Sequence, residues 1–392
     1  MLHRRMLLSV LAVCLAFPCA TFAGQTPLVF GLLLVGPAND KGYSQAQYEG
    51  GRYVEAKLPG ARMIYLDSVN PTDRPGLTIP QAVDDMAAKG ARLVIAGSDD
   101  MRDGILEAAA RHPEMTFIHV SGDDVLTGKA PKNLGNLFAK IEYGKMMAGF
   151  AAAMTTKTGK IGYLGPLVND ETRRVANAAY LGARYAWTAV RGQRPEDLVF
   201  KVNWIGFWFN IPGVTADPNQ VAGAFFDQGF DVVISGLDAP EALVVAEARR
   251  KAGADMHALP YVYKPACELA PEACLGVPYF NWGPPFLIIA REVAAGTYKP
   301  AFAWLSPDFA DMNNPDTSPV GFLPGPGLSE AAKKAVDIFA AGLGAGIVDL
   351  YAGPLDYQDG TVFVPAGRTA TEQELWRCPQ LLRGMQGQSA AK

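Results

Sequence analysis

The sequence predicts an α/β fold in which two lobes, each built on a doubly wound parallel sheet, are joined by a hinge. Short apolar runs, typical of strands covered on both faces, alternate with helix-length segments, as in the βαβ units of a parallel sheet. This alternation occurs twice and starts afresh near residue 159. At 392 residues, the chain is also too long for one compact core and suits two domains of ordinary size.

The first series opens with the apolar run 27–35, which Gly36 and Pro37 terminate and which fits a buried strand. The series continues with a helix at 44–57, a strand at 62–66, a helix at 79–89, a strand at 91–96, a helix at 104–111 and a strand at 116–120. A polar stretch containing Gly and Pro, residues 122–135, separates this series from the second one.

A long helical run at 141–154 leads into the second series, whose segments are a strand at 159–165, a helix at 172–190, a strand at 198–204, a helix at 219–227, a strand at 231–235 and a helix at 239–251. The later part of the chain is richer in Pro and Gly and is expected to cross between the lobes. We expect residues 367–392 to form a polar, disordered tail. The expected lobes are 24–138 with about 283–318, and 139–282 with about 319–366.

The composition, with 49% hydrophobic and 19% charged residues and a net charge of −4, is typical of a folded globular protein and argues against nucleic acid as a partner. The first 23 residues resemble a secretory signal, with Arg4 and Arg5 before an apolar run at 6–17. We expect cleavage after Ala23 and a periplasmic location. Later stretches fall short of the ~20 apolar residues that a membrane helix needs.

The cysteines admit several arrangements. Lipid attachment at Cys14 or Cys19 is disfavoured because a bulky residue precedes each of them. Cys267 and Cys274 could close a small disulfide in an oxidising compartment, which would leave Cys378 over. Two unpaired thiols are the alternative, and a metal site is the poorest reading because no histidine or third cysteine shares the spacing.

Ligands of open parallel sheets lie beyond the carboxyl ends of the strands. The loops at those ends are residues 36–43, 97–100, 121–124, 165–171, 204–210, 235–238 and 261–264. We therefore expect a ligand cleft between the lobes. Two α/β halves joined by short connections are also the arrangement of a binding protein that closes by a hinge motion.

Several motifs follow one another along the mature chain, namely Asn39-Asp40-Lys-Gly-Tyr43, Ile141-Glu-Tyr-Gly144, Lys157-Thr-Gly-Lys160, Arg174-Val-Ala-Asn177, Gly206-Phe-Trp208-Phe-Asn210, Asn281-Trp282-Gly283 and Gly353-Pro-Leu-Asp356. In this order and spacing they resemble the basic membrane protein (PnrA-like) family, and the resemblance covers nearly the whole mature chain. It implies the type 1 periplasmic binding-protein fold and the substrate-binding role in an ABC-type importer. The implied partners are a small molecule (a purine base, nucleoside or related heteroaromatic) and an ABC permease.

In this family an aromatic side chain from each lobe stacks on one face of the ligand base, and Tyr43 and Trp208 match these two positions. Stacking on an aromatic ring is worth about 1–3 kcal/mol per base. Tyr43 could instead pack on the helix that follows it. In the aromatic cluster 204–209, we assign Trp204 to the core and Trp208 to the ligand.

Polar candidates stand in the same loops. Asp40 fits an acidic position of the family, with helix capping as the alternative. Of Ser98, Asp99 and Asp100, which stand between a strand and a helix, one should cap the helix and another, preferably Asp99, should reach the cleft. Asp238 could likewise either cap the helix that follows it or reach the cleft. The remaining candidates for ligand binding are Asn39, Gly122, Gly236, Tyr263 and Trp282.

Two departures from the family pattern bear on the ligand. Nucleoside-binding members carry an acidic residue after the strand that here leads into Tyr263, and a lysine just before the Asn-Trp-Gly motif. This chain has no acid at the first position and Phe280 at the second. Strong partners for sugar hydroxyls are therefore missing. The sequence favours a free base or another flat heteroaromatic over a ribonucleoside.

An enzyme is not favoured by the sequence. The histidines of the mature chain, His112, His119 and His257, do not stand at metal-ligand spacing, and we interpret them as structural. No nucleophile elbow, phosphate-binding loop or dinucleotide fingerprint follows a strand. We expect no catalytic residue, metal or cofactor, and a monomer. Alternatives are a ligand-binding sensor for a membrane receptor and, less favoured, a secreted nucleoside hydrolase.

Overall fold

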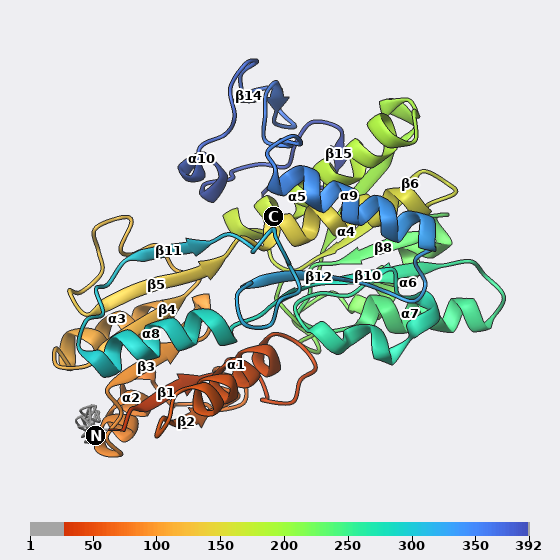
Figure 1. Ribbon diagram of the computed structural model, residues 1–392. Helices are drawn as coiled ribbons and strands as arrows, with labels where there is room; N and C mark the ends of the chain where they lie inside the picture. The colour runs from red at the N-terminus through yellow and green to blue at the C-terminus, as the bar shows by residue number, and fades with distance from the viewer. Residues whose placement is uncertain (1–26, 391–392) are drawn as a thin grey trace, which may run out of the picture.

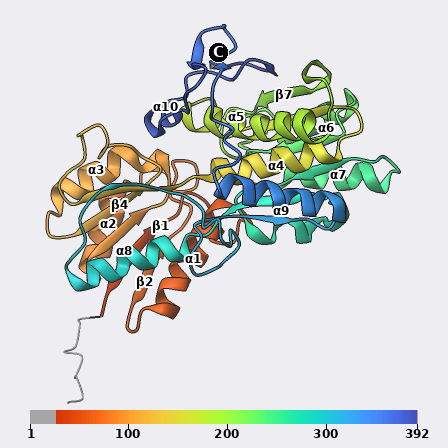
Figure 2. The same ribbon diagram turned by 45° about the horizontal axis from the view of Figure 1, so that its top comes forward.

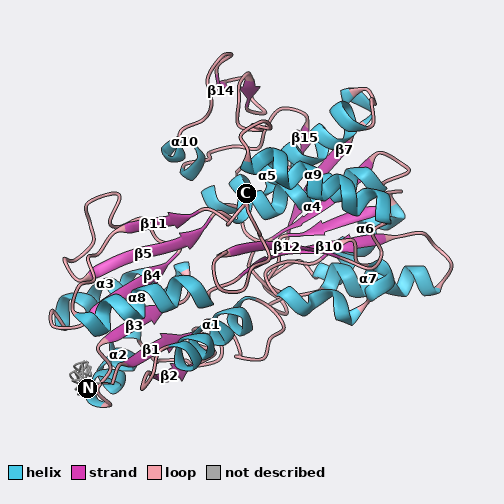
Figure 3. Ribbon diagram, in the orientation of Figure 1, coloured by secondary structure: helices cyan, strands magenta, loops and turns pink. Residues whose placement is uncertain are grey.

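The computed structural model describes residues 27–390, in which two parallel β-sheets lie side by side with helices on both faces (Figures 1 and 3). The expected signal segment, its cleavage site after Ala23 and the cysteines at 14 and 19 lie outside the described residues. Within the described chain, no helix combines the length and the apolarity that crossing a membrane requires.

The first sheet has six strands in the order β11-β5-β4-β3-β1-β2, and every neighbouring pair is parallel. Its strands are β1 (Val29–Leu33), β2 (Arg62–Leu66), β3 (Leu93–Ala96), β4 (Thr116–Val120), β5 (Leu134–Ala139) and β11 (Phe302–Leu305). One face is covered by α1 (Tyr43–Lys57) and α8 (Gly283–Ala295), which pack on each other, and the opposite face by α2 (Ile79–Ala88) and α3 (Arg102–Arg111). Since both faces are covered, the central strands β1 and β3 are apolar throughout, and β4 is mostly apolar.

The second sheet has five strands in the order β15-β7-β6-β8-β9, again all parallel. They are β6 (Lys160–Gly165), β7 (Val199–Trp204), β8 (Val232–Ser235), β9 (His257–Leu259) and β15 (Met385–Gln386). One face carries α4 (Ile141–Thr155), α5 (Asp170–Tyr185) and α9 (Glu330–Gly344), and the other carries α6 (Pro218–Asp227) and α7 (Glu241–Lys251). The π-helix η2 (Ala186–Val190) continues α5, and the 3-10 helix η3 (Pro195–Asp197) precedes β7.

The two sheets repeat one local topology. The first sheet contains the order β2-β1-β3-β4, and the second contains β7-β6-β8-β9. In both, the second strand of the series lies on one side of the first strand, and the third and fourth strands lie on its other side. In each sheet the strand order therefore reverses beside the first strand of the series, which is where open α/β sheets form a ligand crevice. The predicted fold class, two doubly wound parallel-sheet lobes, is confirmed.

Three connections carry the chain from one lobe to the other. They follow β5, β10 (Gly276–Phe280) and β11 (Figure 1). β10 and β12 (Val320–Pro324) form an antiparallel pair that packs on α4. The first sheet takes its strands from residues 29–139 and 302–305, and the second from 160–259 and 385–386. The boundaries expected for the lobes stay predictions.

Two segments differ from the sequence-based expectation. The sequence did not indicate β5, which begins inside the stretch expected to be polar. The tail expected to be disordered contains α10 (Glu372–Trp376) and β15, and a small antiparallel pair, β13 (Leu355–Asp356) and β14 (Val362–Val364), precedes it. Order in the tail has a physical cause, because Trp376 is buried against Phe302 and Trp304 of the first lobe while β15 pairs with β7 of the second.

A disulfide joins Cys267 and Cys274, whose Cα atoms are 5.4 Å apart, as the favoured reading of the cysteines expected. It closes the turn made by the 3-10 helices η4 (Lys264–Leu269) and η5 (Pro271–Ala273), which leads into β10. Cys378 is a free, buried cysteine, and burial raises the pKa of its thiol to about 11.

A candidate ligand-binding cleft between the lobes

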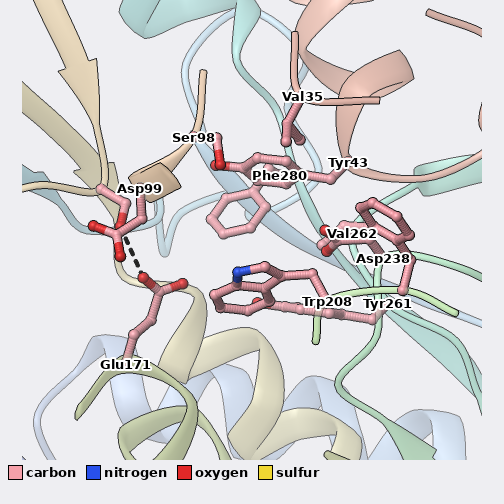
Figure 4. A pocket seen from close by; sticks show the side chains of 12 residues that line it. Val35, Tyr43, Ser98, Asp99, Glu171, Trp208, Asp238, Tyr261, Val262 and Phe280 are labelled. Atoms are coloured by element: carbon pink, nitrogen blue, oxygen red, sulfur yellow. Dashed lines mark hydrogen bonds between the residues drawn. The ribbon is translucent and has the colours of Figure 1, made fainter. Parts of the chain in front are cut away.

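A cleft lies between the carboxyl ends of the strands of the two lobes, and its empty space, open solvent included, is about 450 Å³ (Figure 4). Strand-end loops of both lobes contribute to its wall, as the sequence analysis expected. The lining residues are Val35, Tyr43, Ser98, Asp99 and Ser121 from the first lobe, and Glu171, Trp208, Phe209, Asp238, Tyr261, Val262 and Phe280 from the second lobe and the β10 end.

Two aromatic side chains face the cleft from opposite sides. Tyr43, the first residue of α1, is held by edge-to-face contacts with Phe280 and Trp282, at centroid distances of 5.9 and 6.0 Å. Trp208 lies on the other side, in the loop after β7, and its carbonyl oxygen accepts a hydrogen bond from the Asp238 amide, at 3.1 Å. A planar ring placed between Tyr43 and Trp208 would therefore meet one aromatic side chain from each lobe.

Three carboxyl groups complete the wall. Asp99 opens the 3-10 helix η1 (Asp99–Met101) after β3, where the Ser98 hydroxyl accepts a hydrogen bond from the Asp100 amide. Glu171 lies in the first turn of α5 and accepts a hydrogen bond of 2.9 Å from the Ser121 hydroxyl of the other lobe. Asp238 follows β8. The side chains that line the cleft in the described chain include no lysine, arginine or histidine.

Burial shifts the pKa values of Glu171 and Asp238. It raises the pKa of Glu171 to about 7, against the lowering effect of Arg174, and Asp99 acts in the same direction as burial. The pKa of Asp238 is raised well above its usual range, again by burial first and then by the charges of Asp40 and Glu171. Displaced pKa values of acidic groups gathered in a cleft are a mark of functional sites.

A buried lysine lies behind the cleft wall. Lys145 of α4 is fully buried, its Nζ donates a hydrogen bond to the Ser235 carbonyl oxygen, and it lies 3.5 Å from the centroid of the Tyr261 ring. Burial lowers its pKa well below the usual range, although Asp238 opposes this shift. Lys145 therefore fixes the end of β8 and the Tyr261 ring, both of which border the cleft.

The loop that carries Ser98 and Asp99 is fixed from behind. The Nε2 atom of His119 lies 3.0 Å from the Ser98 carbonyl oxygen, and Arg102 pairs with the buried carboxylate of Asp124. Burial lowers the pKa of His119. Because the loop is anchored through its backbone, the Asp99 carboxylate stays available to the cleft.

The backbone of the cleft is tightly packed and locally strained. A Cβ atom on Gly42 would lie 1.8 Å from the carbonyl oxygen of Asp238 in the other lobe. Ser121 and Val262, which both line the cleft, have φ angles of 82° and 65°. Such left-handed conformations are uncommon for residues other than glycine and are outliers for a β-branched side chain. Strain of this kind gathers at ligand sites.

The structure brings together five of the side chains expected at the ligand, namely Tyr43, Ser98, Asp99, Trp208 and Asp238. Asp40 has the helix-capping arrangement that was its alternative reading, since its carboxylate accepts hydrogen bonds from the amides of Gly42, Ser44 and Gln45. Asp238 does not cap α7, which begins after Pro240 without a side-chain cap.

The remaining expected residues lie around the cleft. Tyr263 and the buried Trp282 border a neighbouring groove, in which the Tyr263 hydroxyl accepts a hydrogen bond of 2.7 Å from Gln45 of the first lobe. Gly122 borders an outer groove that adjoins the cleft, and Gly236 packs against Tyr163, leaving no room for a larger side chain. Asn39 is exposed on the loop before α1.

Several lining residues were not singled out from the sequence. Glu171 and Ser121 stand in loops that the strand-end argument had marked, and Tyr261 opens another such loop. Their position after a strand was the available signal. This position did not distinguish Glu171, Ser121 and Tyr261 from their neighbours. The contact between Glu171 and Ser121 arises only when the two lobes meet. Trp204, assigned to the core, is half-buried and donates a hydrogen bond to the Gln388 carbonyl oxygen.

Solved structures show the same fold. An ABC transporter solute-binding protein from Conexibacter woesei superposes with a TM-score of 0.61 at 17% identity, over 82% of this chain and 97% of that one. A second, from Aeropyrum pernix, gives a TM-score of 0.63 at 12% identity, over 84% and 93%. These similarities show the fold, in which two α/β lobes enclose a cleft.

Comparison of sequences finds relatives that are named as ligand-binding proteins. Residues 28–194 match the family described as ABC transporter substrate-binding protein PnrA-like. The chain is 27% identical to a purine-binding protein of Brucella abortus over 90% of this chain and 91% of that protein. It is 24% identical to an ABC transporter nucleoside-binding protein of Lactococcus lactis over 57% and 60%. The match over residues 28–194 agrees with the resemblance to the PnrA-like, or basic membrane protein, family that the motifs indicated.

Proposed function

We propose that this protein captures a purine base, or a similar planar heteroaromatic, between its lobes as the periplasmic substrate-binding component of an ABC-type importer. The observation that carries the proposal is the pair of aromatic side chains, Tyr43 and Trp208, which face one cleft from different lobes. Each face of a bound ring would stack on one of them, at about 1–3 kcal/mol per contact.

Ligand capture would be coupled to closure of the lobes. Contacts that join them include Ser121 to Glu171 at 2.9 Å and Gln45 to Tyr263 at 2.7 Å. A ring bound on one lobe gains its second stacking partner only when the lobes meet, so the ligand favours the closed form. The closed surface is then the form that an ABC permease would recognise, with the protein acting as an exported monomer.

A free base is favoured over a nucleoside by the end of the cleft near β10. Phe280 lines this end, and its ring stacks on Trp282 at a centroid distance of 4.8 Å. An aromatic wall offers no partner to ribose hydroxyl groups, whereas a flat ring gains contact area from it. The purine-binding relative from Brucella abortus supports the same choice.

Isothermal titration calorimetry with adenine tests the proposal. The Trp208→Ala variant should bind about tenfold more weakly or worse, because one stacking partner is lost. Trp204→Phe is the matched control, since Trp204 belongs to the same aromatic segment without lining the cleft, and it should retain wild-type affinity. Absence of binding to every purine and pyrimidine base would overturn the proposal. Unchanged affinity of the Trp208→Ala variant would remove this residue from the site.

A further inference from the structure

The cleft holds more acceptor capacity than the protein itself satisfies. Among the described residues, the carboxylates of Asp99 and Asp238 accept no hydrogen bond, and that of Glu171 accepts one, from Ser121. Each ionised carboxylate can accept several hydrogen bonds. Three groups in one cleft are therefore available to a ligand that donates hydrogen bonds.

Positive charges near the cleft are engaged elsewhere. Lys145 donates to a backbone carbonyl oxygen behind Tyr261. Arg174 pairs with the buried Glu142, and its guanidinium lies 4.5 Å from the centroid of the Trp376 ring. Arg102 pairs with Asp124. None of these three cations therefore pairs with the cleft carboxylates, which leaves them free to accept a hydrogen bond or a positive charge from a ligand.

The three carboxylates are placed around the edge of the space between the aromatic rings. Asp99 and Glu171 lie at one edge and Asp238 at the other, with the Tyr43 ring above and the Trp208 ring below in the view of Figure 4. Carboxylates attract N–H groups at the edge of a bound heterocycle, and aromatic faces attract positive charge above and below it. The carboxylates at the edge and the aromatic rings at the faces therefore both favour a ligand ring that carries N–H groups or positive charge.

We propose that the cleft selects its ligand by hydrogen-bond donors and positive charge on the ring, so that it takes amino-substituted or protonated heteroaromatics and rejects rings of the same shape that lack donors or carry negative charge. Asp99, Glu171 and Asp238 are the specificity-determining residues. This inference rests on the proposed function, namely capture of a planar ring in the same cleft.

The charge distribution across the lobes supports this selectivity. Asp99 approaches the cleft from the first lobe, and Glu171 and Asp238 from the second, so closure without a ligand brings like charges together. The raised pKa values of Glu171 and Asp238 reflect this crowding as well as burial. A ligand that brings N–H donors or a positive charge relieves the repulsion, whereas an anionic ring increases it.

A pair of ligands of equal size tests the inference on the unmodified protein. Adenine and 6-methylpurine differ in one substituent, an amino group in the first and a methyl group in the second. Calorimetry at neutral pH should show adenine binding about tenfold more tightly or better, because a hydrogen bond to a charged group is lost with the methyl compound. Urate, which is anionic at neutral pH, should show no binding.

Variants of the three acids identify the groups responsible. Asp99→Asn, Glu171→Gln and Asp238→Asn keep the side-chain shape but remove the negative charge, and in at least one of them the affinity ratio of adenine to 6-methylpurine should fall toward one. Asp123→Asn is the control, because Asp123 borders the outer groove and not the cleft, and should keep the wild-type ratio.

The outcomes separate the inference from the proposed function. If adenine and 6-methylpurine bind the wild-type protein equally well, the selectivity is wrong while ring capture stands. If neither compound binds, and no other planar heterocycle binds either, the proposed function itself is wrong. A wild-type ratio in all three acid variants would show that other residues determine the specificity.

Discussion

Glu171 shows how a side chain takes its chemistry from tertiary packing. A carboxylate in the first turn of a helix is ordinarily favoured, because the free backbone amides there carry partial positive charge. Here the other lobe covers the same carboxyl group, and burial raises its pKa to about 7. The group therefore changes its charge near neutral pH.

The raised pKa of Glu171 gives stability a definite pH dependence. Because the pKa in the folded protein, about 7, lies above the ordinary value of 4.5, the folded chain binds more protons than the unfolded chain between these values. The contribution of Glu171 to the free energy of unfolding is complete below pH 4.5 and is lost as the pH rises through about 7. Urea unfolding of the Glu171→Gln variant should lack this loss. If the free energy of unfolding varied with pH in the same way in the wild type and in this variant, Glu171 would not be the group responsible.

Gly42 supports a second prediction at the level of a single residue. Its φ angle of −145° suits any residue, but a methyl group would collide with the Asp238 carbonyl oxygen across the cleft. Gly42→Ala should therefore hold the lobes apart and weaken ligand binding by about tenfold or more, with little change in melting temperature.

Calorimetry and thermal unfolding of the Gly42→Ala variant check this expectation. Gly223→Ala is the matched control, because a Cβ atom there comes no closer than 3.8 Å to Arg249. The control should bind like the wild type. Wild-type affinity of the Gly42→Ala variant would show that the lobes close without this contact.

The candidate site could be predicted from the sequence only where residue type and family pattern coincide. Tyr43 and Trp208 were found because aromatic residues stand in strand-end loops that match the family motifs. Asp40 could not be separated from a capping residue, because the same short loop geometry serves both roles. Glu171 depends on its contact with Ser121 of the other lobe, which no local pattern reveals.

Among the secondary-structure elements, those of the C-terminal segment contact both lobes. Trp376 of α10 packs edge-to-face on Phe302 and Trp304 of β11, and its carbonyl oxygen accepts a hydrogen bond from Arg174 of α5. Further along, β15 pairs with β7 of the second sheet. The segment (blue in Figures 1 and 2) therefore contacts both lobes and closes one side of their junction.

Removing the Trp376 side chain should be costly. Trp376→Ala leaves a cavity between the β11 aromatic rings and exposes the Arg174 guanidinium, so the free energy of unfolding should fall by about 3–5 kcal/mol. Urea denaturation measures the change. Glu372→Ala, in the same helix, is the control, because Glu372 is exposed and pairs only with Lys140, a contact worth at most about 1 kcal/mol. Equal stability of the two variants would contradict the role of α10 as a joint between the lobes.

Prediction from the sequence succeeded for elements with strong periodicity. The buried strands β1, β3, β4, β6 and β8 and the helices between them were found within a few residues. β5 was missed because its sequence, 134–139, follows a polar stretch and holds Gly and Asn among its apolar residues. The C-terminal segment was expected to be disordered because its order derives from Trp376 and from pairing with a distant strand, not from local pattern.

At the level of the whole molecule, the fold places the carboxyl ends of two parallel sheets against each other. Each sheet reverses its strand order beside its first strand, and each reversal opens toward the other lobe. The two-lobed fold followed from the repeated alternation in the sequence. The closeness of the lobes could not be predicted from this alternation, because it depends on contacts such as that between Gln45 and Tyr263, which are 218 residues apart.

A crystal structure of the protein with adenine tests the central claim most directly. The account predicts a flat ligand between the rings of Tyr43 and Trp208, with its N–H groups directed at one or more of Asp99, Glu171 and Asp238. A ligand bound outside this cleft, or a ring in the cleft that touches neither aromatic side chain, would contradict it.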